Sequence, residues 1–429
     1  MSYQAIICKI QTRPHPNADA LCLGTVHGYQ VVVGLDTNDG DLGVFFPTDG
    51  QLSPEMAEAN DLIGYKDEAT GERRGGFFGK NRRVRSQKFR GEKSDGYWTP
   101  LKALEFTGVN TSTLSEGDQF TELNGIPVCN KYFTPATLKA QQAGKGKARR
   151  ENDLFAKHID TLQLRNEIDR LPDDAVIYVT EKLHGTSGRV GLVKETVNLP
   201  TPKWKRPFAK AFKIKNKTAS EWVPLLGTRN TILADHTQEG FYGSEEFRWN
   251  SVEKIVPNLR KGEIIYFELV GFTTTGQPIM AQPSTKELKD IKKQYGEQMT
   301  FAYGQAPGTC GLHVYRITRV NEDGDAVELP WTQVKARCRE LGINHVPEIE
   351  YASPFLYDSH RPDILSEGVE FHMEGSSLLD DSHIREGVVV RAELPDGSTT
   401  FLKSKSFSFG IIEGYLKTSD DYVDAEEIA

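Results

Sequence analysis

The chain has 429 residues, of which 26% are charged and 38% hydrophobic, and its formal net charge is −8. This length allows two or three domains with substantial cores. The five scattered cysteines argue against a disulfide framework and a cysteine-based zinc site, and no apolar run predicts a signal peptide or a membrane span. We therefore expect an intracellular, cytoplasmic protein without a membrane partner.

Residues 1–130 predict a small antiparallel β-barrel. Short β-like runs such as Ala5–Ile10 and Gln30–Gly34 alternate with turns rich in Gly, Asn and Asp. The stretch His-Pro-Asn-Ala-Asp at 15–19 and the later run 83–98 resemble tRNA-binding OB domains. The resemblance implies a barrel whose basic, aromatic-bearing face follows a nucleic-acid strand. Its candidate nucleic-acid-binding residues are Arg83, Arg85, Lys88 and Arg90.

Basic residues gather in three segments although the net charge is negative. Residues 73–93 contain nine Lys or Arg but only Glu92 as an acid, residues 139–150 contain five Lys or Arg, and residues 194–217 contain eight. The third segment also carries three large aromatic side chains, whereas acidic residues gather in the C-terminal tail. A charge run is commonly only a solvated surface, but three runs with interleaved aromatics favour binding to a phosphate backbone.

Residues 131–150 predict a basic, flexible linker between two domains. The run Gly-Lys-Gly-Lys at 144–147 lacks the spacing of a phosphate-binding P-loop. Apolar residues recur with helical spacing over 151–171, and Pro172 then ends the run. The second predicted domain covers 151–429, with further helices expected at 286–295 and 331–341.

Five short motifs in this second domain fall on or beside β-rich runs. The first follows Val176–Val179 and ends in Gly185-Thr186, a pattern typical of a buried strand that runs into a tight turn. In chain order the motifs are Glu181-Lys182-Leu183-His184-Gly185-Thr186, Tyr266-Phe267-Glu268, Val314-Tyr315-Arg316-Ile317, Arg385-Glu386-Gly387-Val388-Val389-Val390 and Leu402-Lys403-Ser404-Lys405.

This order resembles the collinear motifs of the covalent nucleotidyltransferases, the superfamily of ATP-dependent ligases and RNA capping enzymes. The form Lys-x-His-Gly-Thr at 182–186 is similar to the RNA ligase branch. Residues 158–165 resemble the leader that precedes the lysine motif in RNA ligases with an N-terminal OB domain, those of the Naegleria and Deinococcus type. The implied fold class is α+β, with an OB-like β-barrel followed by an antiparallel-sheet nucleotidyltransferase domain around an ATP cleft.

The chemistry explains why these residue types are needed. A lysine amine attacks the α-phosphate of ATP only after it loses its proton, and burial or neighbouring positive charge lowers a lysine pKa. Lys403 and Lys405 alternate on a predicted strand, so both face the same side, beside the phosphates and Lys182. Glu268 and Glu386 supply hydrogen-bond acceptors for ribose hydroxyls and hard oxygen ligands for Mg²⁺ or Mn²⁺.

The resemblance implies an ATP-dependent RNA ligase of RNA repair, which joins 3′-hydroxyl and 5′-phosphate ends in a nicked duplex or at broken RNA ends. Lys182 would carry AMP and pass it to the 5′-phosphate, which the 3′-hydroxyl then attacks. Glu386 would organise the metal, Tyr315 would stack on adenine, and Glu268 would bind the ribose. The ATP-binding set implied in this way is Glu181, Lys182, Arg229, Glu268, Tyr315, Lys403 and Lys405.

Two alternatives stay open at this level. A DNA ligase or a GTP-dependent capping enzyme shares the fold, but these usually carry their OB domain after the catalytic domain. A catalytically inactive RNA-binding protein would be expected to lack a motif lysine or glutamate, and none is missing. The role of His184, where many superfamily members have Asp, stays open, as does the role of the basic insertion at 194–225.

Overall fold

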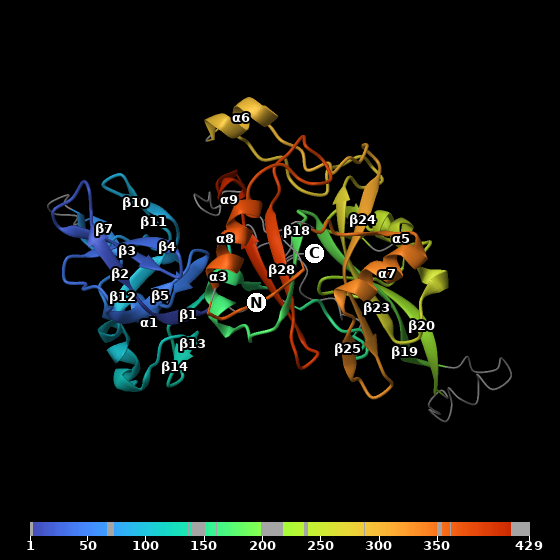
Figure 1. The fold of residues 1–429 in the computed structure, drawn as a ribbon, viewed down its shortest axis with the longest axis horizontal. Coiled ribbons are helices and arrows are strands. Elements are labelled where there is room, and N and C mark those ends of the chain that lie inside the picture. Colours follow the sequence, from blue (N-terminus) through green and yellow to red (C-terminus); the bar gives the residue numbers. More distant parts are fainter. Residues whose placement is uncertain are drawn as a thin grey trace, which may run out of the picture. The chain divides into compact units, whose positions relative to one another are not determined.

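The computed structural model describes residues 3–66, 73–135, 138, 151–159, 161–198, 218–235, 239–286, 288–349, 354–360 and 362–412. Its contacts divide the chain into two compact units, unit 1 over Met1–Lys139 and unit 2 over Ala140–Phe409, with the residues after Phe409 divided between them (Figure 1). Most of the predicted linker, of the basic insertion and all of the acidic tail lie outside the described residues. The predicted domain limits therefore stay predictions.

The sheets are almost entirely antiparallel and helices are few, so the expected α+β class is confirmed. The parallel pairs among the named strands are β17 with β29 and β24 with β26. Among the described residues no helix has the length and the apolar character that a membrane crossing requires.

Unit 1 consists of short strands joined by tight turns, as its turn-rich sequence predicts. One sheet has the strand order β12-β5-β1-β13, and β2-β3-β4 and β16-β6-β9 form two more. The strands are β1 (Ala5–Lys9), β2 (Gln11–Pro14), β3 (Leu21–Val26), β4 (Tyr29–Gly34), β5 (Leu42–Phe46), β6 (Gly50–Leu52), β7 (Gly64–Lys66), β8 (Arg73–Gly75), β9 (Arg83–Val84), β10 (Gln87–Phe89), β11 (Glu92–Ser94), β12 (Tyr97–Pro100), β13 (Gln119–Phe120), β14 (Glu122–Leu123), β15 (Ile126–Pro127) and β16 (Cys129–Lys131). The helices are α1 (Pro54–Ala59) and the 3₁₀-helices η1 (Leu101–Thr107) and η2 (Thr111–Thr113).

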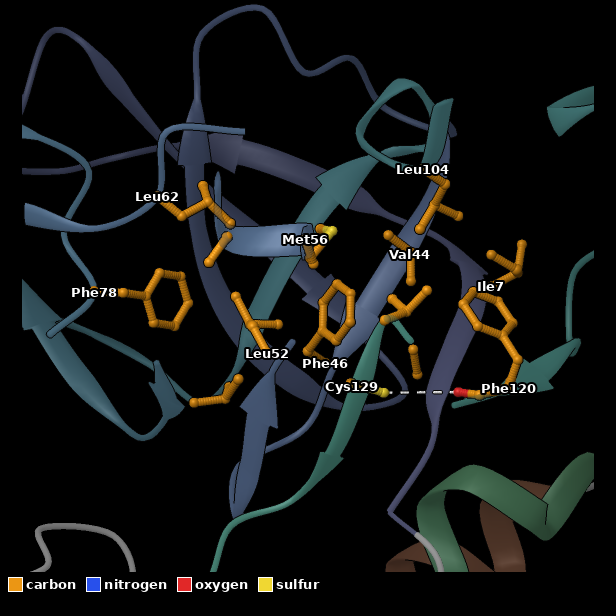
Figure 2. Close-up of a cluster of buried hydrophobic side chains, with 14 residues drawn as sticks. Ile7, Val44, Phe46, Leu52, Met56, Leu62, Phe78, Leu104, Phe120 and Cys129 are labelled. Atoms are coloured by element: carbon orange, nitrogen blue, oxygen red, sulfur yellow. Dashed lines mark hydrogen bonds between the residues drawn. The ribbon is translucent and has the colours of Figure 1, made fainter. Parts of the chain in front are cut away.

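Strand β5 is central to unit 1 because both of its faces are covered. Side chains alternate along a strand, so Val44 and Phe46 enter one apolar cluster while Phe45 enters another with Trp98. Figure 2 shows the first cluster, in which Met56 of α1 lies among side chains from several strands. A strand buried on both faces accounts for the continuous apolar run Val44-Phe45-Phe46.

Unit 2 contains two larger sheets. One has five strands in the order β17-β29-β28-β18-β27, and the other has six, with β20-β19-β23-β24-β25 in order and β26 paired to β24. Helix α8 supplies Leu365 and Val369 to the core of the five-stranded sheet, near β28 in Figure 1. The strands are β17 (Leu162–Gln163), β18 (Val176–Lys182), β19 (Thr186–Asn198), β20 (Thr218–Thr228), β21 (Glu239–Gly240), β22 (Gly243–Ser244), β23 (Glu263–Gly271), β24 (Cys310–Val320), β25 (Ala326–Glu328), β26 (Asn344–His345), β27 (Phe355–Leu356), β28 (Gly387–Glu393) and β29 (Thr399–Lys405).

The helices of unit 2 agree only in part with the sequence patterns. The expected helix at 331–341 is confirmed as α7, and the one at 286–295 is shorter. The single helix expected over 151–171 is wrong, because Leu162 and Gln163 pair with β29 as strand β17 and only short helical turns follow. The helices are α3 (Leu164–Glu167), α5 (Glu246–Val252), α6 (Lys289–Tyr295), α7 (Trp331–Leu341), α8 (Pro362–Met373) and α9 (Phe407–Ile412), with the 3₁₀-helices η3 (Ile168–Arg170) and η5 (Val256–Asn258).

A buried ion pair fastens α7 to the start of β23. The guanidinium of Arg337 donates from Nε and Nη2 to the two carboxylate oxygens of Glu263, each at 2.8 Å, and both side chains are at most 4% exposed. The same guanidinium pairs with Glu340, one turn further along α7, at 2.7 Å, but Glu340 is 52% exposed. Arg337 therefore has one buried and one solvated carboxylate partner.

This contrast predicts unequal costs for removing the two carboxylates. Glu263→Gln should lower the free energy of unfolding of unit 2 by about 3 kcal/mol, because it leaves a buried guanidinium without its countercharge. Glu340→Gln, the matched control, should cost much less, because solvent already screens that pair. Urea denaturation of the two variants measures the difference, and equal losses would contradict the structural role given to Glu263.

Candidate active site

Three neighbouring strands place the first and last sequence motifs beside each other. In the sheet register Lys182 at the end of β18 lies opposite Gly387 of β28, and Gly387 lies opposite Lys405 of β29. Gly387 has φ +150°, and a Cβ there would come within 2.2 Å of the Ser404 carbonyl oxygen. Only glycine fits between the two lysine-bearing strands at this point.

The carboxylate of Glu386 lies between the two lysines. Its Oε1 is 2.8 Å from Nζ of Lys182 and 2.9 Å from Nζ of Lys405, and its side chain is fully buried. Burial by itself would raise the pKa of Glu386, but the charges of Lys182 and Lys405, together with His184, outweigh it and hold that pKa well below the ordinary value of 4.5. Glu386 is therefore an anion held by two cations.

His184 lies in the turn after Lys182 and closes this group. Its Nδ1 is 3.6 Å from Oε2 of Glu386, and its ring meets the rings of Phe301 and Phe409 edge-on at 4.7 and 4.8 Å. Phe409 also lies 5.6 Å from the Lys405 ammonium, within cation–π range. The imidazole is thus oriented by two aromatic rings beside the buried carboxylate.

A second group of side chains lies on the six-stranded sheet. Glu268 of β23 pairs with Ser187 of β19 across the sheet, and the Ser187 hydroxyl donates to Glu268 Oε2 at 3.0 Å. Tyr315 stands opposite no residue of β23, because a β-bulge shifts the register there. Its hydroxyl is hydrogen-bonded to Nδ1 of His158 at 3.1 Å. Burial and then the charge of Glu268 raise the pKa of Tyr315, so it stays a neutral phenol beside that carboxylate.

Arg229 follows β20 and belongs to this second group. Its positive charge acts on Tyr315, where it opposes the rise in pKa. Its backbone carbonyl accepts a 2.7 Å hydrogen bond from the buried Arg189 guanidinium, which also lies 4.7 Å from the Phe155 ring. The buried Arg189 therefore fixes the backbone of the loop that carries Arg229.

Tyr303 connects the two groups. Its hydroxyl accepts a 2.7 Å hydrogen bond from the backbone N–H of His184, and its own backbone has φ +52°, a strained value for tyrosine. Burial raises the pKa of Tyr303 well above its ordinary value, and the nearby charges of Glu181, Glu386 and Glu268 raise it further. Carboxylates of both groups therefore act on one neutral phenol, and that phenol holds the turn at 183–185.

The family comparison identifies this arrangement. The RNA ligase family model matches residues 175–405, more than half of the chain and the whole span of the five motifs. The chain belongs to the RNA ligase family. This confirms RNA ligation, the function expected from the motifs.

Solved structures of Naegleria gruberi RNA ligase share the fold of this RNA ligase. A lysine-to-alanine mutant with ATP and Mn is 17% identical, with 97% of this chain and 99% of that chain covered and a TM-score of 0.58. A lysine-to-methionine mutant with AMP and Mn is 16% identical with the same coverage and TM-score. The complex with pyrophosphate is 17% identical over 95% and 97% of the two chains, with a TM-score of 0.57. No curated protein matches the sequence significantly.

The donor set fits a divalent cation that arrives with a nucleotide. Among the described residues no cluster of three or more His, Cys, Asp and Glu side chains forms a ready cage for an ion. Magnesium is commonly bound through one or two carboxylates and completed by substrate phosphates and water. Glu386, with both oxygens facing basic groups, suits that kind of shared site better than a closed protein site.

Two more predicted ATP-binding residues lie on the same sheet as Lys182. Lys403 sits two residues before Lys405, so both face the same side of β29 as expected. Glu181 precedes Lys182, so its side chain leaves the opposite face of β18, where Oε2 accepts the Leu378 N–H at 2.7 Å. Burial raises the pKa of Glu181. Its carboxylate is hydrogen-bonded to the 375–383 loop, on the face of β18 opposite the Lys182 side chain.

The predicted nucleic-acid-binding residues fall into different environments. Arg83 is 6% exposed, lies 3.3 Å from Asp49 and stacks on the Tyr132 ring at 4.3 Å, so its guanidinium serves unit 1 itself. We correct its assignment to a structural one for that reason. Arg85 and Arg90 are exposed, and Lys88 lies on β10 with its side chain outside the described part.

Arg248 is a site residue that sequence reasoning missed. It is fully buried in α5, where its Nη2 donates to the Thr186 hydroxyl at 2.7 Å and its Nη1 donates to the Ser187 carbonyl at 3.0 Å. Glu245 balances its charge at 2.5 Å. The guanidinium thus fixes the start of β19 directly after the motif turn. Its only sequence signal is a Glu–Arg pair three residues apart, which is common on exposed helices.

The depressed pKa of Glu386 predicts a specific pH dependence of stability. A carboxylate whose pKa is lower in the folded than in the unfolded chain stabilises the fold above pH 4.5, and that contribution is lost as the pH falls toward the folded value. The difference in free energy of unfolding between the natural protein and Glu386→Gln should be constant from about pH 7 to 5. Below about pH 4.5 the natural protein should lose stability relative to Glu386→Gln.

Urea denaturation between these pH values measures that difference. Glu322→Gln is the control, because Glu322 is 58% exposed and solvent screens its charge. A difference for Glu386→Gln that does not change with pH would contradict the ionised, doubly paired carboxylate.

Proposed function

We propose that this RNA ligase uses ATP and forms a covalent AMP intermediate on Lys182. The observation that carries the proposal is the Lys182–Glu386–Lys405 group, in which one buried carboxylate lies within 2.9 Å of both amines. It places a nucleophile, a further cation for phosphate oxygens and a metal ligand in one place. The Naegleria gruberi structures with ATP, AMP and Mn support this choice of nucleotide and metal.

Lys182 attacks the α-phosphorus of ATP through Nζ. A P–N bond forms, the bond to the bridging oxygen breaks, and pyrophosphate leaves with that electron pair. The ammonium must first give up a proton to solvent, and its pairing with Glu386 opposes this. Glu386 would be the carboxylate that holds a divalent cation, and such a cation would supply positive charge for the phosphates and the leaving group. Lys405 and Lys403 remain to hold the α-phosphate.

The second group of side chains suits the nucleoside. Tyr315 offers an aromatic face fixed by His158, and Glu268 offers carboxylate oxygens for ribose hydroxyls. Arg229 lies close enough to Tyr315 to act on its phenol and brings a cation toward the phosphates. The nucleoside and the phosphates would thus contact different sheets. The turn at 183–185 joins these two sheets and would set the position of one part of the nucleotide relative to the other.

In the joining steps AMP leaves first Lys182 and then the activated RNA end. AMP passes from Lys182 to the 5′-phosphate of an RNA end, which forms a phosphoanhydride and restores the amine. The 3′-hydroxyl of the other end then attacks that phosphate, the new phosphodiester forms, and AMP leaves. We propose nicked duplexes or broken RNA ends in the cytoplasm as substrates, because the two reacting ends must be held side by side.

Lys182→Ala should abolish labelling of the protein by ATP that carries a labelled α-phosphate. Lys405 brings a second amine to the same carboxylate, so the variant decides which of the two lysines carries AMP, and Lys182→Arg should fail as well because a guanidinium stays protonated. A denaturing gel after incubation with metal and either labelled ATP or labelled GTP measures the transfer. Lys292→Ala, a change at a lysine 44% exposed on α6, is the control and should be labelled normally. Labelled Lys182→Ala would move the nucleophile elsewhere, and labelling by GTP alone would reject ATP.

The strand with the 3′-hydroxyl should have to be RNA near the break, whereas the 5′-phosphate strand can be DNA. A protein senses RNA through A-form groove shape and 2′-hydroxyl contacts, and the terminal sugar sets the in-line approach of the attacking oxygen. Deoxyribose at the terminal nucleotides of that strand should slow joining by about 100-fold, the scale of a small misplacement of reacting groups. Joining rates on nicked duplexes that differ only in these sugars measure the effect. Equal rates on all-DNA nicks would contradict RNA selectivity and leave the Lys182 chemistry intact.

A further inference from the structure

An aromatic cluster in unit 1 runs from the core to the surface. Phe78 is buried in the core, and Tyr97 meets it edge-on at 5.1 Å. Phe77 lies outermost, with its ring 4.5 Å from that of Phe78, 5.6 Å from that of Tyr97 and 5.4 Å from that of Phe89. Phe77 remains 47% exposed despite these three contacts. Its inner side is held rigidly, and part of its ring is offered to solvent.

The neighbouring hairpin is fixed by the turn that resembles OB domains. His15 Nε2 donates to the backbone carbonyl of Phe89 at 3.1 Å, while its Nδ1 accepts the Asn17 N–H at 3.0 Å. After Phe89 the chain reverses through Arg90 and Gly91, both with positive φ. This turn keeps Phe89 against Phe77 and presents the exposed Arg90 one residue away.

The described residues that follow Phe77 in the chain carry several exposed cations. Lys80, Arg85 and Arg90 are exposed and form no ion pair with an acidic residue in the described part of the chain. The two acids in this segment are already engaged, Glu92 with the Gln30 amide and Asp95 with Lys93 and Ser86. A rigid aromatic ring among exposed cations is the combination that binds single-stranded nucleic acid, in which the ring takes a base and the cations take phosphates.

We propose that Phe77 is a stacking platform for a base of unpaired RNA, with Lys80 and Arg90 contacting the adjoining phosphates. The proposal rests on the RNA ligase function and adds where, and through which chemistry, unit 1 grips its substrate. A single exposed apolar side chain is ordinary on a protein surface. Phe77 differs because three aromatic neighbours fix its ring, so little order has to be gained on binding, and because the exposed Arg90 directly follows its contact Phe89.

The test is fluorescence anisotropy of a 12-nucleotide fluorescein-labelled single-stranded RNA with the full chain over a series of salt concentrations. Phe77→Ala should weaken binding by about tenfold, the effect of losing one stacked base, without changing the salt slope. Phe77→Trp should restore the affinity, and its added indole fluorescence should be quenched by RNA. Arg90→Gln should instead lower the salt slope by about 0.7, one phosphate contact on a single strand.

Tyr65→Ala is the matched control, because Tyr65 is an aromatic residue of the same unit and is 52% exposed. Its RNA affinity should be that of the natural protein. Natural affinity in Phe77→Ala, or unquenched fluorescence in Phe77→Trp, overturns the proposal and leaves the cluster to a protein partner. An equal loss in Tyr65→Ala also overturns it. The proposed ligase chemistry is tested separately by AMP labelling of the natural protein. That labelling does not involve Phe77, so its absence would reject the chemistry and not the stacking platform.

Discussion

The carboxylate of Glu386 is the constraint on which the rest of the site depends. A fully buried charge is costly unless opposite charges and good geometry accompany it, and here two ammonium groups lie within 2.9 Å. That geometry requires the register in which β18 and β29 flank β28, with a glycine between the lysine-bearing strands. Removing either lysine would leave the negative charge of Glu386 only partly compensated. The stability of the fold and the proposed chemistry therefore require the same three residues.

The turn at 183–185 carries that constraint from one sheet to the other. Tyr303 holds the turn through the His184 amide, and Arg248 holds the first residues of β19 beyond it. Gly185 allows the close approach, because a Cβ there would lie 2.2 Å from the Leu269 carbonyl oxygen of β23. The Lys182–Glu386–Lys405 group and the group of Tyr315 and Glu268 are thus parts of one arrangement rather than two independent sites.

The sequence was sufficient for the strands and the motif residues, because strand alternation and strand ends place side chains by simple rules. Lys182 at the end of β18 and Lys403 with Lys405 on one face of β29 follow from period two alone. The helix expected at 151–171 failed because pairing of Leu162 and Gln163 with β29 overrode their spacing. Arg83 looked like a surface cation, but Asp49 and Tyr132 bury it. Tyr303 and Phe409 act through contacts made across long loops, which no local pattern encodes.

The buried ion pair at the end of β18 also bears on the proposed role of Lys182 as the nucleophile. Glu386 lies 2.8 Å from the Lys182 amine, so a lysine that attacks a phosphate from this position would first have to leave that carboxylate. His184 and Phe409 pack against this group, with His184 Nδ1 3.6 Å from Glu386 and the Phe409 ring 5.6 Å from the Lys405 ammonium. Under the proposed mechanism, reactivity would depend on the arrival of the nucleotide with its cation. The ion pair that compensates the buried charge of Glu386 would then also control when Lys182 can react.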